Sequence, residues 1–144
     1  MTGVLLDTHA LLWLRAPAPM SVESIFAVDH ASQANSLFIS PISAWELGVS
    51  SRKKNPARRP ELLGLTPEDY FTKVTGILNV KPVPISTEIG LASSSLLNLY
   101  DRGDPGDCLI MATAHVLQLT LVTRDRHILD FARRHPSYMD VVAC

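Results

Sequence analysis

The chain has 144 residues, a length typical of one domain and sufficient to bury a core without a metal or a disulfide staple. Hydrophobic residues make up 47% of it and charged residues 19%, with a mean hydropathy of +0.15, which excludes a disordered chain. The net charge of −1 and the pI near 6.5 exclude a surface that attracts nucleic acid everywhere, whereas a local basic patch is still possible. We expect one domain over residues 1–144, with enough apolar surface to offer to a partner.

Neither targeting segments nor cysteine-based sites are predicted. No apolar run approaches the roughly 18 residues of a membrane span, and Met1–Leu6 lacks the residue order of a signal peptide, so we expect a cytoplasmic protein without membrane contact. Cys108 and Cys144 do not have metal-ligand spacing, which excludes a zinc finger and a disulfide framework. Because Cys108 lies in an apolar segment, we expect it to be a reduced core thiol.

The apolar pattern predicts strands that alternate with helices. A continuous apolar run over residues 3–7 is typical of a strand buried on both faces, and several helix starts have a cap residue followed by proline. The alternation predicts an α/β fold with a mostly parallel sheet and no internal repeat. The expected strands are 3–7, 37–40, 81–85, 119–123 and 139–142, with 81–85 and 139–142 at sheet edges. The expected helices are 9–14 after a Thr8 cap and ended by Pro17 and Pro19, then 21–34, 41–49, 66–78, 86–99 with Ile89, Ala92, Leu96 and Leu99 on one face, 104–117 and 126–134, while 50–64 is largely a loop.

Four acids stand beside or just beyond apolar segments, which is unusual for solvated acids: Asp7, Glu46, Asp107 and Asp125. Residues that directly follow parallel strands converge at the carboxyl ends of those strands, so Asp7 and Asp125 should lie close together. Asp104 and Asp107 are three residues apart and share one face in the first turn of a predicted helix. The helix dipole stabilises an anion there by only about 0.3 to 1 kcal/mol. That is too little to gather several carboxylates, so the cluster needs a positive partner.

A hard divalent cation is the partner that such a cluster favours. Carboxylate ligands without cysteine are typical of Mg²⁺ or Mn²⁺ sites. Such an ion can activate a water molecule and stabilise the charge of a phosphoryl transition state. The acids therefore predict the hydrolysis of a phosphate ester.

Each acid also has a purely structural interpretation. Asp104 before proline is a good helix N-cap, and Asp107 stands where a capping box carries its acid. Asp125 suits a turn, and Glu46 can simply face solvent, because adjacent helical residues do not share a face. The four signals together favour a site more than any one of them alone.

Basic and aromatic residues near the acids have two interpretations as well. The candidate contacts to a phosphate backbone are Arg52, Lys53 and Lys54 and, beside Asp125, Arg124 and Arg126. The first three are by default a solvated loop, and the last two can pair with Asp101 or Asp130 instead. Trp45 suits the core better than a base-stacking platform, and His9 suits a packed or exposed position better than an acid–base role.

Four blocks in this order resemble the motifs of PIN-domain proteins, and especially the VapC toxins of toxin-antitoxin pairs. They are Leu6-Asp7-Thr8-His9-Ala10-Leu11-Leu12-Trp13, Ile42-Ser43-Ala44-Trp45-Glu46-Leu47, Asp104-Pro105-Gly106-Asp107 with Leu109-Ile110-Met111-Ala112-Thr113-Ala114, and Leu121-Val122-Thr123-Arg124-Asp125. The resemblance spans nearly the whole chain. It implies a PIN-like three-layer α/β/α fold with about five strands, and a ribonuclease that depends on Mg²⁺ or Mn²⁺.

The resemblance also implies roles for residues and partners. It assigns the acidic site to Asp7, Glu46, Asp107 and Asp125, with Asp104 as an additional acid of the subgroup. Thr8 and Thr123 match hydroxyl positions that orient metal ligands or water. Further expectations are an RNA substrate, a homodimer, and a VapB-like antitoxin whose C-terminal segment covers the site.

The segment around Asp104 departs from the family pattern. Relatives of this subgroup commonly have His-Arg-Asp-Pro-Phe-Asp-Arg, whereas this chain has Arg102-Gly103-Asp104-Pro105-Gly106-Asp107-Cys108. The acids are intact, but the RNA target cannot be carried over. Two other functions stay open on the residues: a phosphatase or phospho-acceptor domain with Asp7 as nucleophile, against which His9 counts, and a non-catalytic binding module, against which the complete set of acids counts.

Overall fold

The computed structural model describes residues 2–13 and 20–144, and its strands form one sheet. All pairings in the sheet are parallel, in the order β3-β2-β1-β4-β5, which confirms the predicted α/β fold with five strands. The strands are β1 (Val4–Leu6), β2 (Leu37–Ile39), β3 (Lys81–Pro82), β4 (Thr120–Thr123) and β5 (Val141–Ala143). As expected, β3 and β5 are the edges, and β3 is shorter than predicted because prolines cannot donate to the ladder.

Five of the helices begin directly after a residue whose side chain caps them. Ser21, Ser40, Thr66, Ser86 and Asp104 each accept a hydrogen bond from a backbone N–H in the first turn of the helix that follows. The helices are α1 (Ala10–Trp13), α2 (Val22–Gln33), α3 (Pro41–Ser51), the 3₁₀ turn η1 (Pro56–Arg58), α4 (Pro67–Ile77), α5 (Thr87–Leu96), α6 (Pro105–Leu117) and α7 (Arg126–Arg134). The predicted end of the first helix at Pro17 and Pro19 lies outside the described residues.

Two predictions about helices were wrong. The helix α5 ends at Leu96, so Leu99 falls in the turn that follows and is half exposed instead of lying on the buried face. Thr8 does not cap α1, because its hydroxyl is engaged with side chains of α3. The stretch 50–64 is mostly loop, as expected, although α3 reaches Ser51 and η1 interrupts it.

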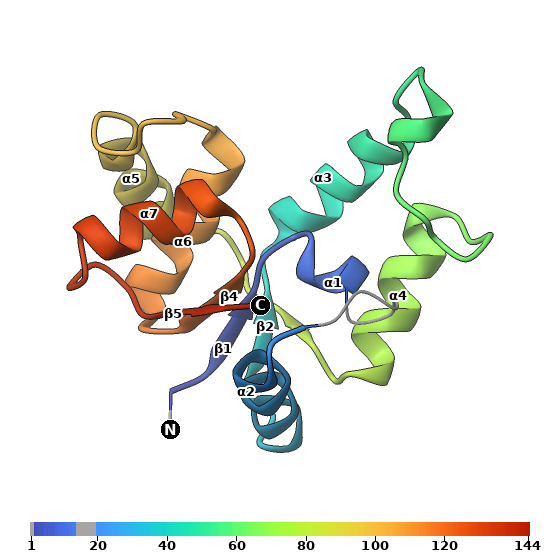
Figure 1. Cartoon of the computed structure of the whole chain (residues 1–144), viewed down its shortest axis with the longest axis horizontal. Helices are drawn as coiled ribbons and strands as arrows, with labels where there is room; N and C mark the ends of the chain where they lie inside the picture. The colour runs from blue at the N-terminus through green and yellow to red at the C-terminus, as the bar shows by residue number, and fades with distance from the viewer. Residues whose placement is uncertain (1, 14–19) are drawn as a thin grey trace.

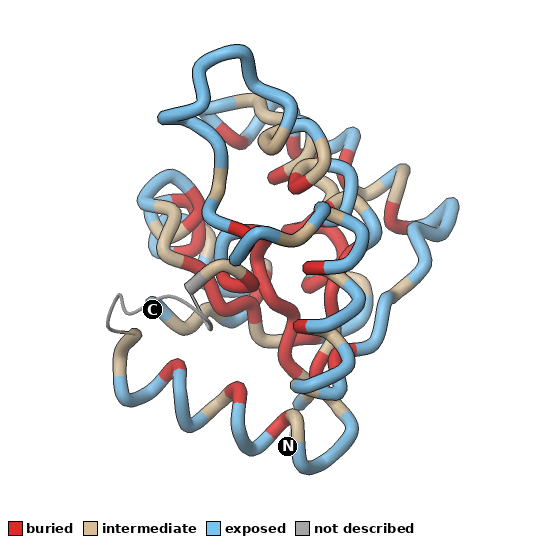
Figure 2. The backbone as a smooth tube through the Cα atoms, turned by 90° about the vertical axis from the view of Figure 1, so that its right-hand side faces the viewer, coloured by how far each residue is buried: buried red, intermediate tan, exposed pale blue. Residues whose placement is uncertain are grey.

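The sheet separates two hydrophobic cores and makes three layers. Leu5 and Leu121 face α5, α6 and α7, while Val4, Leu6 and Val122 face α1, α2, α3 and α4. Figure 1 shows these two groups of helices on opposite sides of the strands. Figure 2 shows buried residues gathered in the middle of the molecule and exposed residues on its outer turns. Alternate side chains of a strand point to opposite faces, so one buried strand supplies both cores.

Two further expectations concern the cysteines and the membrane. Cys108 is a buried free thiol, as predicted, and Cys144 is a half-buried one. In the part of the chain that the structure covers, no helix has the length and apolar character needed to cross a bilayer.

Candidate acidic site

The acids converge at the carboxyl edge of the sheet, where three neighbouring strands end. Asp7 follows β1, α3 starts directly after β2, and Thr123 closes β4. Because β2, β1 and β4 are adjacent in the sheet, the residues that follow them must meet. In Figure 1 this edge lies between α3 on one side and α6 and α7 on the other.

Asp7 is the centre of this cluster and is only 4% exposed. Its Oδ1 accepts a hydrogen bond from the Thr8 N–H at 2.7 Å, and its Oδ2 accepts one from the Thr123 hydroxyl at 2.8 Å. The same Thr123 oxygen accepts a hydrogen bond from the Asp125 N–H at 3.0 Å. Thr123 therefore bridges Asp7 and Asp125, as the expected proximity of these two acids requires.

Glu46 reaches the cluster from the second turn of α3. Its Oε1 accepts a hydrogen bond from the Thr8 hydroxyl at 2.6 Å. The Thr8 hydroxyl also shares a 2.9 Å hydrogen bond with the hydroxyl of Ser43, which is fully buried. Ser43 and Glu46 are three residues apart, so they lie on the same face of α3. Glu46 therefore does not simply face solvent.

Asp107 enters from the first turn of α6 and is 9% exposed. Its Oδ2 accepts a hydrogen bond from the Tyr100 hydroxyl at 2.8 Å, and Tyr100 itself packs edge-on against Phe131. Asp104 accepts the Asp107 N–H at 3.0 Å, so it is the N-cap of α6. It also lies near enough to Glu46 for its charge to act on that residue. Asp104 is thus both a cap and a member of the acidic surroundings.

Burial and mutual repulsion make these carboxyls hard to ionise. Burial is the main cause that raises the pKa of Asp7, and the hydrogen bonds from Thr123 and Thr8 oppose it only in part. Burial, and then the charges of Asp7 and Asp104, raise the pKa of Glu46. Burial and the nearby carboxylates raise the pKa of Asp107 to about 7, against the lowering effect of Tyr100. The cluster therefore favours either protons or a positive ion.

Arg102 is a basic side chain in direct contact with the cluster. Its Nη1 lies 3.0 Å from Oδ2 of Asp125, and the side chain is 46% exposed. Asp125 is also the N-cap of α7, because its Oδ1 accepts the N–H groups of His127 and Ile128. Asp125 is thus a structural cap that lies beside the cluster, and its role in a functional site stays a prediction.

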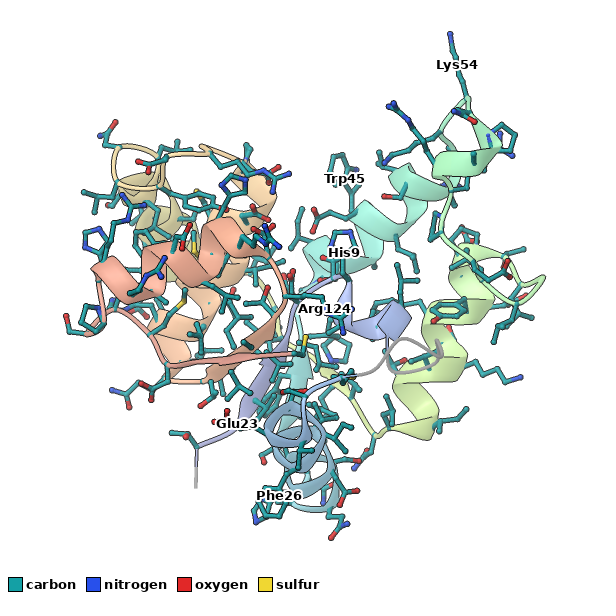
Figure 3. All side chains as sticks on the ribbon, viewed as in Figure 1. His9, Glu23, Phe26, Trp45, Lys54 and Arg124 are labelled. Carbon is teal, nitrogen blue, oxygen red and sulfur yellow. The ribbon has the colours of Figure 1, made fainter. Side chains whose placement is uncertain are left out.

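Most of the predicted basic contacts lie elsewhere. Arg52 is at the end of α3, and Figure 3 shows Lys54 at the far tip of the molecule, away from His9. Arg124 donates to the carbonyl of Cys144 at 2.9 Å. The suggested pairing of Arg124 or Arg126 with Asp101 or Asp130 was wrong, since α7 supplies other partners: Arg134 pairs with Asp101, and Arg133 with Asp130.

Trp45 is not a core residue, which corrects the prediction. Its side chain is 64% exposed, because its neighbours Glu46 and Leu47 take the inward positions on this turn of α3. Figure 3 shows Trp45 projecting outward from α3, above His9. His9 is exposed, as expected, and its charge lowers the pKa of Asp7.

The donor chemistry of the cluster suits a hard divalent cation. All candidate ligands are carboxylates, and no described residue donates a hydrogen bond to Oε2 of Glu46 or Oδ1 of Asp107. Across residues 2–13 and 20–144, no group of three or more acidic, histidine or cysteine side chains is placed so that it could hold a metal ion as it stands. The cluster thus has the charge and the open oxygens that an ion needs, but it is not a preformed cage.

Sequence reasoning missed Ser43, Tyr100 and the pairing of Arg102. Ser43 could have been found, because it stands one helical turn before Glu46. Tyr100 and Arg102 gave no such signal, since they belong to the turn between α5 and α6 and reach the acids only through its shape. Gly103, with a φ of 64°, closes that turn in a conformation that favours glycine.

Comparisons with known proteins agree with this architecture. A family model described as PIN domain matches residues 4–134. Ribonuclease VapC22 of Mycobacterium tuberculosis is 33% identical over 138 residues, which cover 94% of this chain and 95% of that protein. Among solved structures, VapBC2 from Rickettsia felis bound to a promoter DNA fragment is similar, with a TM-score of 0.66, 16% identity and 97% of each chain covered.

A second solved structure gives the same result. DNA-bound VapBC from Salmonella typhimurium has a TM-score of 0.64 and 17% identity, with 99% of this chain and 98% of the other covered. At such identities the likeness concerns the fold. The family model and the Mycobacterium relative each span most of the sequence, and their agreement with the parallel sheet and its acidic edge shows that the chain belongs to the PIN domain family.

Proposed function

We propose that this protein is a metal-dependent endoribonuclease and the toxin of a VapBC-type toxin-antitoxin pair, formed by a single domain over residues 1–144. The observation that carries the proposal is the meeting of two buried carboxyls, Asp7 and Asp107, and the half-buried Glu46 at the carboxyl edge of the sheet, where their pKa values are raised. Such a cluster is unfavourable as bare anions and becomes favourable with a divalent cation. The relative named Ribonuclease VapC22 supports RNA as the substrate.

Asp7, Glu46 and Asp107 are the side chains that would hold Mg²⁺ or Mn²⁺, with Asp125 and Asp104 at the margin. When bound, the ion supplies an activated water molecule and positive charge for the transition state of phosphodiester hydrolysis. The chain's own residues keep the acids in place. Further hydrogen bonds hold the proposed ligands: Thr123 holds Asp7, Thr8 holds Glu46, and Tyr100 holds Asp107.

Arg102 has a different task in this proposal. Its guanidinium pairs with Asp125 at the rim, and it is half exposed, so it can contact a phosphate of the RNA without leaving the site. Arg124 and Arg126 lie beside the same acid in sequence. Arg52, Lys53 and Lys54 are farther away and suit the backbone of a longer RNA, which makes binding sensitive to salt.

We further propose an antitoxin and a second copy of the chain as partners. Similar solved structures are toxin-antitoxin complexes, which supports a VapB-like antitoxin. Exposed apolar side chains on α2, including Phe26 at 68% exposure, offer surface for such association. The proposed cytoplasmic location follows from an RNA substrate.

The test is cleavage of RNA by the wild-type protein and by Asp7→Asn. Asparagine keeps the shape of Asp7 and removes its charge. We expect sequencing of RNA ends after brief expression to show new ends with the wild-type protein and none with the variant. Purified wild-type protein should cleave single-stranded RNA with Mn²⁺ and stop when EDTA is added.

The surface variant Asp29→Asn is the matched control, because it makes the same chemical change on the exposed face of α2. It should cleave like the wild type. Equal cleavage by Asp7→Asn, with circular dichroism showing the same fold, would overturn the assignment. Calorimetry should show a saturable Mn²⁺ site in the wild-type protein, and its absence would favour a non-catalytic module.

A further inference from the structure

A groove of about 440 Å³ lies between the start of α3 and the first turn of α6. Glu46 lines it, so the groove is continuous with the acidic cluster. Its other walls combine apolar side chains, an indole, a glycine and one more carboxylate. In chain order these residues are Ile42, Trp45, Asp104, Pro105, Gly106 and Leu109.

Trp45 makes this groove unlike an ordinary surface hollow. Trp45 is 64% exposed, so its large apolar ring is in contact with water, whereas most tryptophans are largely buried. In Figure 3 the side chain of Trp45 projects from α3 on the same side of the molecule as His9. A flat ring held there offers a face on which another ring can stack.

Gly106 leaves room for the Glu46 carboxylate beside the first turn of α6. A Cβ at this position would lie 3.1 Å from Oε2 of Glu46 and 3.2 Å from Oδ1 of Asp104. The backbone does not require glycine here, since Gly106 is not among the glycines with positive φ. What the missing side chain provides is space next to two carboxylates.

The charges of the lining residues decide what can enter. The groove carries two carboxylates and no cation, so it repels a phosphate group. The same carboxylates accept hydrogen bonds from N–H groups, such as those on the edge of a nucleobase. Stacking on an aromatic side chain suits every base, because each base has a π-face.

We propose that this groove binds one unpaired nucleobase of the RNA, stacked on Trp45, next to the phosphate that is cut. The inference rests on the proposed ribonuclease function and adds a base-binding site to it. The base lies between the indole and the apolar wall formed by Ile42 and Leu109. It thereby fixes which phosphate reaches the acids.

The test is a binding cycle with the Asp7→Asn protein, which is expected to bind RNA without cutting it. A short single-stranded RNA is made with an abasic nucleotide at each position in turn. We expect one position at which the abasic change weakens binding to the Asp7→Asn protein, which retains Trp45, by about tenfold. Trp45→Ala should weaken binding of the intact RNA by a similar factor and remove the effect of that abasic position.

Two variants separate stacking from general damage to the protein. Trp45→Phe keeps an aromatic ring and should retain most of the abasic effect. Val49→Ala removes an exposed apolar side chain one turn further along α3, outside the groove, and should bind every RNA like its parent. Circular dichroism checks that each variant is folded.

The result distinguishes the two proposals. If wild-type protein cleaves RNA with Mn²⁺ but Trp45→Ala shows the same affinities and the same abasic profile, the base site is wrong and the ribonuclease assignment stands. If wild-type protein cleaves no RNA, the proposed function fails. If no abasic position weakens RNA binding more than the others, the base site is excluded.

Discussion

The two walls of the acidic site are built differently. On the α6 wall, Asp107 is nearly buried and held by the hydroxyl of Tyr100, which packs on Phe131 in the core. On the α3 wall, Glu46 is partly open, and its neighbour Trp45 stands in solvent. Both walls bring a carboxylate to Asp7, but the carboxylate on the α6 wall is the more deeply buried of the two.

The difference separates two uses of a side chain. A buried carboxylate loses hydration, so its charge is a cost that an ion can offset. A carboxylate that stays in contact with water loses little hydration free energy, and the space beside it can hold a substrate. We therefore expect changes on the α6 wall to alter ion binding and stability together, and changes on the α3 wall to alter reaction and recognition.

Loss of cleavage is the largest expected effect, and both walls should show it. Glu46→Gln and Asp107→Asn each remove one proposed ligand charge while keeping the side-chain shape. We expect either change to reduce Mn²⁺-dependent RNA cleavage by more than about a hundredfold, beyond the effect typical of residues that only orient ligands. Single-turnover cleavage of a labelled RNA measures this. Wild-type rates in either variant would remove that wall from the site.

Stability against pH should tell the walls apart. The pKa of Asp107 is about 7 in the folded protein, above its ordinary value of 3.8, so the folded state holds its proton more tightly. The associated stability is fully present below about pH 4 and is lost as pH rises through about 7, with a slope of at most about 1.4 kcal/mol per pH unit. Urea unfolding in EDTA measures it. The loss of unfolding free energy with rising pH should be smaller in Asp107→Asn than in the wild-type protein. Adding Mn²⁺ should raise the stability of the wild-type protein again.

An unchanged pH slope in Asp107→Asn would contradict the burial of a charge at this position. Glu46→Gln is the comparison on the other wall. Because Glu46 is more open to water than Asp107, its replacement should alter the slope less.

The hydroxyl of Tyr100 should matter less than the acids, but measurably. Its hydrogen bond lowers the pKa of Asp107, so Tyr100→Phe leaves Asp107 more protonated at neutral pH. We expect about tenfold weaker Mn²⁺ binding, with partial recovery at higher pH. Calorimetric titration at two pH values tests this. Tyr138→Phe is a matched control, because Tyr138 also packs edge-on against Phe131 without touching Asp107.

Arg102 should give the smallest effect, at the rim between the walls. Its charge competes with a metal ion for Asp125, so Arg102→Gln should tighten Mn²⁺ binding by a few-fold and change stability by less than about 1 kcal/mol, as for exposed ion pairs. Arg134→Gln breaks the neighbouring pair with Asp101 and should leave Mn²⁺ binding unchanged. Weaker Mn²⁺ binding in Arg102→Gln would contradict the competition.

The sequence was most informative where chemistry is local. Strands buried on both faces appear as unbroken apolar runs, and a cap followed by proline marks the start of α4 and α6. The convergence of Asp7 and Asp125 followed from parallel strands alone. These features depend on a few adjacent residues, so they could be predicted without knowledge of the whole fold.

What escaped prediction depends on how distant elements pack. Trp45 looked like a core residue because it is large and apolar, but the register of α3 turns Ser43, Glu46 and Leu47 inward and leaves Trp45 outside. Tyr100 reaches Asp107 through a turn whose path no short pattern encodes. Leu99 fitted the helical period, yet α5 had already ended at Leu96.

The hydroxyl of Thr123 has a consequence for how mutations combine. It donates to Asp7 and accepts from the backbone of Asp125, so two acids that follow separate strands share one hydrogen-bonding atom. In Asp7→Asn the amide can donate where the carboxylate accepted, and the hydroxyl must then reverse its direction. The energies of Asp7→Asn and Thr123→Val should therefore be non-additive in a double-mutant cycle, which makes these two strand ends one thermodynamic unit.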